Sequence, residues 1–287
     1  MMQKSLFAFL LLVFCSCSQY GQLHKVANLP RGVNECSGMV TLSPGSFWVV
    51  EDSGNPDVIR EVDTLGRLLR EFEVKDAKNR DWEALTHGPE GRLYVGDIGN
   101  NANTRKDLKI YLLPDPRMEK GDKIPSQTIR FAYPDQQAFP PSKDQRNFDA
   151  EAMVHSNGYL YLFTKNRAEP FPGTTHVYRL PDQPGTYLAQ RVATLQTCSQ
   201  RGACQVTDAA LSPDGSCLVM LGYGTLWVLE GFGETGFNGP IRQIDLGTRA
   251  QLESICFASD TLLYLADEKN GGHGGNLYRY PLPRTRK

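Results

Sequence analysis

The sequence lacks the features of several common classes of protein. Beyond the first nineteen residues, no apolar run is long enough to span a membrane, and no segment sustains the periodicity of an amphipathic helix. The net charge is only −1, so nothing in the composition favours nucleic acid as a partner. The chain contains no Gly-x-Ser-x-Gly elbow, no His-Glu-x-x-His helix, no phosphate loop and no dinucleotide fingerprint. The familiar local signatures of hydrolases, metalloproteases and nucleotide-binding enzymes are therefore missing.

The N-terminus predicts export. Residues 1–16 are interpreted as a signal peptide, because a basic start at Lys4 precedes an apolar run from Ser5 to Phe14. Ser16-Cys17 resembles a lipoprotein cleavage site, so we expect Cys17 to be lipidated; an ordinary secretory signal cut nearby is the alternative. Residues 17–287 are expected to form a single domain. It would be held at a cell-envelope membrane, periplasmic or outer, only through the lipid, or be secreted.

Five cysteines lie beyond the first nineteen residues, and their spacing fits no structural zinc site. Export permits disulfide bonds. Cys198 and Cys204 flank a short, polar, glycine-containing loop, which makes them the expected pair. Cys217 and Cys256 lie in apolar runs and are expected to pack as small hydrophobic residues.

A hairpin pattern recurs about five times and predicts the fold. Each copy has two short strands of alternating polar and apolar residues around a turn, followed by further strand-like runs. The turns lie at residues 43–45, 88–91, 157–158, 212–215 and 259–260. Repeats of roughly 45–70 residues with four strands each are typical of propeller blades. The sequence therefore predicts an all-β propeller of five four-stranded antiparallel blades, with six blades as the alternative.

The first strand-like run has no partner beside it in the sequence. Residues 22–29 precede the first hairpin alone, and the fifth repeat ends one strand short. We expect residues 22–29 to complete the last blade, because this would close the ring and remove an exposed sheet edge. Residues 187–195 are assigned to the outer strand of the third blade. Residues 115–125 are interpreted as an exposed polar excursion from the second.

Acidic residues recur at the open ends of the hairpins. Folding the second hairpin about Glu90 places Glu83 opposite Asp97, and the same count places Glu253 opposite Asp267 in the fifth. Like charges at such positions are unfavourable unless a cation joins them. If each hairpin is the innermost pair of its blade, these open ends meet on one face of the ring, beside the central channel.

The first and third hairpins vary this pattern, with Asp52 in the first and Glu151 opposite Lys165 in the third. Carboxylate and amide oxygens suit Ca²⁺. The predicted ligands of a Ca²⁺ ion are Asp52, Glu83, Asp97, Glu151, Glu253 and Asp267. Two alternatives stay open: a catalytic or ligand-binding site, and a polar lining in which cations pair with the acids. The cations considered for such a salt-bridged plug are Arg80, Arg146, Lys165 and Lys269.

Histidine is considered because many hydrolases use it as a general base. His87 and His155 each follow a hairpin glutamate by four residues, where the other hairpins have Leu or Phe, and are expected to be channel or core residues. His273 lies in a glycine-rich loop on the acidic side. The catalytic candidates are Glu83, Glu151 and His273, and the residues alone do not decide between an enzyme and a binding protein.

Several motifs together resemble a known group of proteins. They are Glu35-x-Ser-Gly-Met39, Glu51-Asp-Ser-Gly-Asn55, Asp81-Trp-Glu-Ala84, Leu93-Tyr-Val-Gly-Asp-Ile-Gly-Asn100 and Asp149-Ala-Glu-Ala152. In these motifs the chain resembles exported, largely uncharacterised bacterial β-propeller proteins and, more distantly, the phytase-like (esterase-like) and SdiA-regulated propellers. The resemblance implies an exported propeller.

The phytase-like part of the resemblance implies Ca²⁺-dependent hydrolysis of phosphoesters, in which metal ions hold phosphate and activate water. The residues it implicates are Glu83, Asp97, Glu151, Glu253 and Asp267. The sequence has no evident cluster of Lys and Arg to receive a polyphosphate. We therefore expect a monomeric binding or scaffold module for a small molecule or an envelope protein, with a Ca²⁺-dependent phosphoester or ester hydrolase as the alternative.

Overall fold

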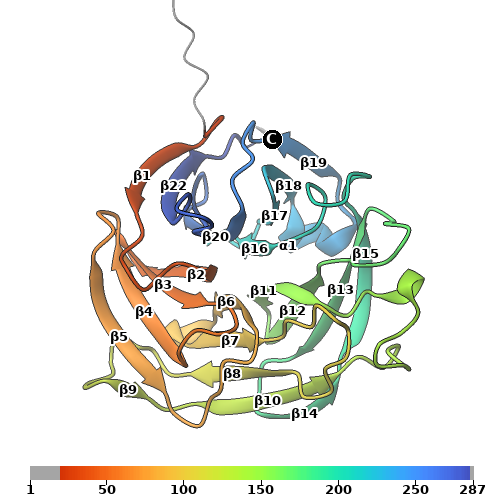
Figure 1. The fold of residues 1–287 in the computed structure, drawn as a ribbon, viewed down its shortest axis with the longest axis horizontal. Helices are drawn as coiled ribbons and strands as arrows, with labels where there is room; N and C mark the ends of the chain where they lie inside the picture. Colours follow the sequence, from red (N-terminus) through yellow and green to blue (C-terminus); the bar gives the residue numbers. More distant parts are fainter. Residues whose placement is uncertain (1–19, 285–287) are drawn as a thin grey trace, which may run out of the picture.

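The computed structural model describes residues 20–284 as a ring of five β-sheets around a central channel (Figure 1). Each sheet is one blade, and its innermost strand contacts the innermost strands of the two adjacent blades. The predicted five-bladed propeller is confirmed. The predicted signal peptide and Cys17 lie outside the described residues. Within the described range, no helix is long and apolar enough to cross a membrane.

The blades follow one another along the chain. Blade one contains β2 (Cys36–Ser43), β3 (Ser46–Glu51), β4 (Val58–Asp63) and β5 (Leu68–Val74). Blade two contains β6 (Trp82–His87), β7 (Leu93–Asp97), β8 (Lys109–Leu113) and β10 (Gln127–Ala132). Blade three contains β11 (Ala150–Ser156), β12 (Tyr159–Thr164), β13 (Thr174–Pro181) and β15 (Gln190–Gln196). Blade four contains β16 (Asp208–Leu211), β17 (Cys217–Gly222), β18 (Thr225–Glu230) and β19 (Ile241–Asp245), and blade five contains β20 (Leu252–Ser259), β21 (Leu262–Asp267) and β22 (Asn276–Pro281).

The N-terminal strand completes blade five. β1 (His24–Asn28) pairs antiparallel with β22, with His24 opposite Arg279. The backbone N–H of Leu29 continues the attachment by donating to Gly275 O at 2.7 Å. The expectation that residues 22–29 supply the missing strand is confirmed. The first and last strands of the ring are thereby held together by main-chain hydrogen bonds.

Two short strands join neighbouring blades. β14 (Gly185–Leu188) adds to blade two by pairing parallel with β10, and β9 (Lys123–Ile124) adds to blade one by pairing parallel with β5. The assignment of residues 187–195 to one outer strand of blade three was therefore wrong, because only β15 belongs there. The excursion 115–125 is mostly loop but ends in β9, where Ile124 is fully buried. Both additions cover sheet edges that would otherwise be open.

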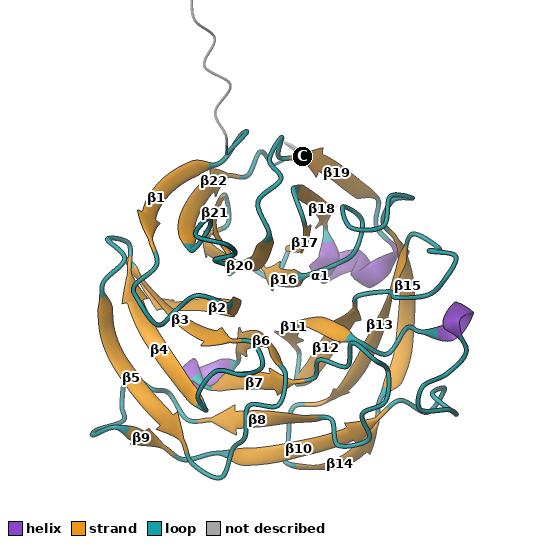
Figure 2. Ribbon diagram, in the orientation of Figure 1, coloured by secondary structure: helices purple, strands orange, loops and turns teal. Residues whose placement is uncertain are grey.

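The core lies between adjacent blades. Trp48 and Phe72 of blade one, for example, pack in one cluster with Trp82 and Tyr111 of blade two, and all four are buried. Strands supply nearly all the regular structure (Figure 2). Among the described residues the only α-helix is α1 (Phe232–Thr235), which is a single turn. The side chains that line the channel are thus positioned by the strands and by the residues directly next to the strand ends.

Candidate metal centre

The inner strands of blades two, three and five each contain one extra residue near the channel mouth. Trp82 pairs with Asp97 and Ala84 with Gly96, so Glu83 is the unpaired residue of a β-bulge. Glu253 occupies the same position between Leu252 and Ser254, and Glu151 lies between Ala150 and Ala152. A bulge redirects a side chain out of the regular alternation.

The predicted register of these hairpins was therefore wrong by one residue. Trp82, not Glu83, lies opposite Asp97, and Leu252, not Glu253, lies opposite Asp267. Because the bulge removes the glutamate from the ladder, the two carboxylates of each hairpin do not face each other across it.

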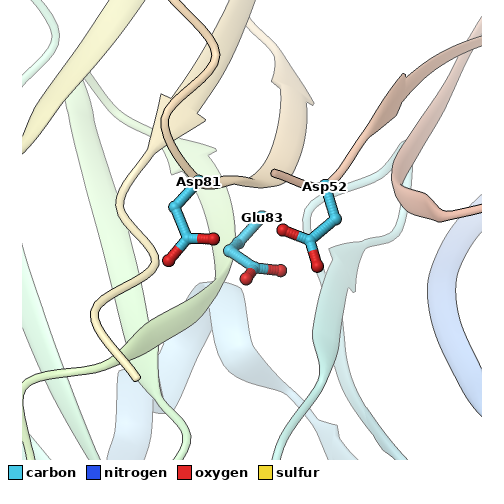
Figure 3. A group of neighbouring side chains, drawn as sticks. All are labelled: Asp52, Asp81 and Glu83. Atoms are coloured by element: carbon cyan, nitrogen blue, oxygen red, sulfur yellow. The ribbon is translucent and has the colours of Figure 1, made fainter. Parts of the chain in front are cut away.

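Asp52, Asp81 and Glu83 form a cluster of carboxylates, which we call the acid triad. One oxygen from each lies within 4.8 Å of the others, and the three side chains point into the same space (Figure 3). Asp52 follows β3 in blade one, whereas Asp81 and Glu83 come from the start of β6 in blade two. In residues 20–284 none of the three forms a salt bridge. The Glu83 side chain is also buried and makes no hydrogen bond to a described residue.

Neighbouring residues hold the backbone of the triad in place. The Asn79 side chain donates to the backbone carbonyl of Asp52 at 2.9 Å and accepts from Trp82 N at 3.0 Å. Asp97 Oδ1 accepts from Asp81 N at 3.0 Å, while Arg105 Nη2 donates to the same oxygen at 3.0 Å. Asp97 thus fixes the backbone of Asp81, and its own charge is paired with Arg105.

Gly99 packs directly against the acid triad, and its lack of a side chain leaves room for Asp81 and Glu83. A Cβ at this position would lie 2.4 Å from Oδ2 of Asp81 and 2.8 Å from Cγ of Glu83. No side chain fits there without displacing a carboxylate. The glycine of the Asp97-Ile-Gly-Asn100 segment is therefore required by close packing against the two acids.

Burial and the neighbouring carboxylates raise the pKa values of two members of the triad, Asp81 and Glu83. Burial, and then the charge of Asp52, raises the pKa of Asp81 to about 7. Burial, followed by the charges of Glu151 and Asp52, raises the pKa of Glu83 well above its ordinary value. Such shifts mean that the ionised forms lack compensation within the protein. A bound cation would supply it.

The other half of the same mouth does contain cations. Lys165 Nζ lies 3.0 Å from Glu151 Oε2 and 3.9 Å from Glu253 Oε1. Burial lowers the pKa of Lys165, but Glu151 and Glu253 outweigh burial and raise it, so the ammonium stays charged. Tyr223 also donates to Glu253 Oε1 at 2.5 Å. This half matches the salt-bridged lining that the sequence left open as an alternative.

Arg167 completes that half. It bonds to Asp149 and lies 3.1 Å from Glu151 Oε1. Asp149 is fully buried and also accepts from Asn100 N at 2.6 Å. The sequence interpretation missed Arg167, and it also missed Asp81 as a member of the triad. Asp81 stands in a motif that was singled out, two residues before Glu83, which was the available signal.

The remaining predicted site residues lie apart from the triad. Asp267 is buried against blade five, where it accepts hydrogen bonds from Asn276 N (2.7 Å) and the Tyr278 hydroxyl (2.8 Å). His273 lines an open pocket of about 540 Å³ that also includes Asp267 and Glu268. Of the other proposed plug cations, Arg80 pairs with Asp107, away from the triad. The structure thus brings together Asp52 and Glu83 from the predicted ligands, and adds Asp81.

Cys198 and Cys204 form a disulfide bond in the structure. Among the described residues, Cys36, Cys217 and Cys256 are free and buried, as was expected of Cys217 and Cys256. Burial raises the pKa of the Cys217 thiol to about 11, which makes it unreactive. A disulfide is consistent with an extracellular or otherwise oxidising compartment.

Comparison with known proteins assigns no family to the chain. No protein-family model and no curated protein matches the chain. Among solved structures, a chain of "Crystal structure of Nidogen/Laminin Complex" is similar, with a TM-score of 0.46 and 10% sequence identity over 82% of this chain and 73% of that chain. The description of the fold rests on the five sheets of this chain and not on that likeness. The fold and the site together define a five-bladed β-propeller, a common binding scaffold, with an acidic channel mouth.

Proposed function

We propose that this protein is an exported binding module that holds a Ca²⁺ ion at one mouth of its channel. The observation that carries the proposal is the acid triad, which lies within 4.8 Å and has no cation partner among residues 20–284. Ca²⁺ takes six to eight oxygen ligands, and three carboxylates supply up to six when each is bidentate. Water or a ligand would complete the shell.

Export is the second part of this proposal. It rests on the predicted signal peptide of residues 1–16, with lipid attachment at Cys17, and the Cys198–Cys204 disulfide is consistent with it. The partner would be a small molecule or an envelope protein that offers an oxygen to the bound ion. The acidic mouth does not favour a polyanion as the partner. Its basic residues, Lys165 and Arg167, are already paired with Glu151, Asp149 and Glu253.

The alternative, a Ca²⁺-dependent phosphoester or ester hydrolase, needs a free cationic group or a general base beside the ion. Lys165 and Arg167 are both engaged with carboxylates, and His273 lies in a different pocket. We therefore favour the binding module. Hydrolysis of phytate, simple phosphomonoesters or esters by the purified Ca²⁺-loaded protein, absent in Glu83→Gln, would reverse this preference.

Thermal unfolding tests the metal site directly. At a Ca²⁺ concentration of about 100 times Kd, binding adds about 2.7 kcal/mol to the free energy of unfolding. For a domain of this size the melting temperature should rise by roughly 5–10 °C relative to chelator. Glu83→Gln should abolish this shift, because it removes the central carboxylate of the triad.

Glu253→Gln is the matched control. Glu253 occupies the same bulge position in blade five, but it bonds to Tyr223 and lies outside the triad. The Ca²⁺ shift should persist in this variant. Absence of a shift in the unmodified protein, or equal loss in both variants, would overturn the assignment of the triad as the metal site.

A further inference from the structure

A second cavity lies at the opposite end of the same channel, and we call it the neutral mouth. Its volume is about 230 Å³, and all five inner strands contribute to it. The contributions are Met39–Thr41 of β2, Leu85–His87 of β6, His155 of β11, Ala209–Leu211 of β16 and Ile255–Phe257 of β20. His155 lies four residues beyond Glu151, which at about 3.3 Å per residue places it roughly 13 Å along the channel.

The lining of the neutral mouth carries no Asp, Glu, Lys or Arg. Its walls include the apolar side chains of Leu85, Ile255 and Phe257, and its polar groups include His87 and His155. Transfer of a charged ligand into such a site would cost its hydration without an opposite charge to replace it. The cavity therefore favours an uncharged molecule.

His155 is held in one orientation. Its Nε2 lies 2.8 Å from Asp182 Oδ2, and the Tyr94 ring stacks on the imidazole at 5.5 Å with an interplanar angle of 10°. Burial raises the pKa of Asp182, but hydrogen bonds from His155 and Gln183 outweigh it and hold this pKa below its ordinary value. Because an ionised carboxylate only accepts hydrogen bonds, Nε2 of His155 is the donor to Asp182. When the imidazole carries this one proton, Nδ1 is a hydrogen-bond acceptor.

Nδ1 of His155 has no partner in the described part of the chain. The only hydrogen bond of this side chain is the one through Nε2. Nδ1 is also not sealed in the interior, in contrast to Nδ1 of His176, which is buried without a partner. A fixed acceptor on the wall of a cavity that combines apolar and polar surface is an arrangement by which ligand pockets orient a single polar group.

We propose that the neutral mouth binds a small, uncharged ring compound with a hydroxyl group, of which phenol is the simplest, and that the hydroxyl donates to Nδ1 of His155. The size fits, since an apolar cavity of about 150 Å³ accepts benzene, and 230 Å³ leaves room for a substituted ring. This site is independent of the proposed Ca²⁺ site, because no residue of the acid triad lines it.

Ligand titration of the unmodified protein, by calorimetry or ligand-observed NMR, tests the proposal. Phenol should bind, benzene should bind about tenfold more weakly because the hydrogen bond is missing, and benzoate should not bind measurably at the same concentration. The signals of the His155 imidazole should shift when phenol is added. Equal affinity for phenol and benzene, binding of benzoate, or no binding of any probe would overturn the proposal.

His155→Leu provides the second arm, and His24→Leu is its control. His155→Leu should reduce the affinity for phenol to that for benzene. His24 is exposed on β1 and does not line the cavity, so His24→Leu should bind phenol like the unmodified protein. If His155→Leu does not fold, as judged by circular dichroism, the phenol and benzene comparison on the unmodified protein decides the outcome. A folded His155→Leu that still prefers phenol would show that His155 does not receive the hydroxyl.

Discussion

The two mouths of the channel are formed by the same five strands, yet their chemistry is opposite. The acidic mouth lies at the upstream ends of the inner strands, where Asp52 and Lys165, which follow β3 and β12, join Asp81, Glu83, Glu151 and Glu253. The lining of the downstream ends has no formally charged carboxylate, ammonium or guanidinium group. A single bulge residue near the start of an inner strand is enough to bring a glutamate to the first mouth. Four residues later the strand supplies His87, His155 or Phe257 to the second.

The residue type at the bulge position determines what each blade contributes to the channel mouth. In blade one Ser37 takes this position, and its hydroxyl donates to the Trp82 carbonyl at 2.6 Å. Next to β16 in blade four, Thr207 donates in the same way to the Leu252 carbonyl at 2.8 Å. A hydroxyl there joins adjacent blades, whereas a glutamate adds charge to the channel. The bulge glutamates of the acidic mouth therefore come from three of the five blades, and blade one adds Asp52 from the end of its second strand.

Removal of the buried cation should have the largest effect. Lys165→Met leaves Glu151 and Glu253 without their shared ammonium, and breaking a buried pair in this way costs about 3–5 kcal/mol of unfolding free energy. Chemical denaturation at pH 8 in chelator measures it. The exposed Lys120→Met should change the free energy by less than about 0.5 kcal/mol. A loss below about 1 kcal/mol in Lys165→Met would contradict the buried ion-pair description.

Filling the space beside the triad should have the next largest effect. Gly99→Ala places a methyl group 2.4 Å from Oδ2 of Asp81, and overpacking of this kind costs about 1–3 kcal/mol. It should also abolish the Ca²⁺-dependent rise in melting temperature. Gly233→Ala is the control, because its Cβ would lie 3.2 Å from the Gly215 carbonyl oxygen and 3.8 Å from the carbonyl carbon, far from the triad in the sequence and in another blade. A Gly99→Ala protein with a normal Ca²⁺ shift would place the ion elsewhere.

In chelator, the melting temperature should fall as the pH rises from about 5 to 8. Burial raises the pKa of Glu253 from 4.5 to about 8, against the charge of Lys165, and burial with the charge of Asp52 raises that of Glu268 to about 7. Between the unfolded and folded pKa values the folded state binds more protons, so its stability decreases as the pH rises.

Differential scanning calorimetry at a series of pH values measures this slope. Glu253→Gln is the control, since it should flatten the decline by removing one of the carboxyl groups with a raised pKa. A melting temperature that instead climbs steadily from pH 5 to 8 in chelator would contradict the raised pKa values.

The smallest effect on Ca²⁺ binding is expected from a substitution at the neutral mouth. His155→Leu should leave the Ca²⁺ shift unchanged within error, because His155 lies at the neutral mouth and contacts no residue of the triad. The free energy of unfolding of His155→Leu should be about 1 kcal/mol lower, because the hydrogen bond to Asp182 is lost. If His155→Leu instead weakened Ca²⁺ binding as Glu83→Gln does, the two mouths would be coupled rather than independent.

Local patterns in the sequence were sufficient for the architecture. Turns such as Asn157-Gly158, with alternating residues on both sides, predict hairpins over a span of about fifteen residues, and five of them predicted the blades. The lone run 22–29 and the short last repeat predicted the closure by β1. These inferences hold because strand alternation and turn conformation depend on neighbours in the chain. The crossing of β14 to blade two was not predicted, because it depends on which sheet edge lies nearby in space.

The composition of the acid triad could not be predicted in full from such local patterns. Composition and spacing showed that acids recur at the hairpin ends, and Glu83 and Asp52 were chosen for that reason. Only the folded ring revealed that Asp52 of blade one meets Asp81 and Glu83 of blade two, and that Glu151 and Glu253 share Lys165 instead. One bulge residue shifts the register, and packing between blades then sets which side chains meet. Both depend on contacts between residues far apart in the chain, which a periodic pattern does not contain.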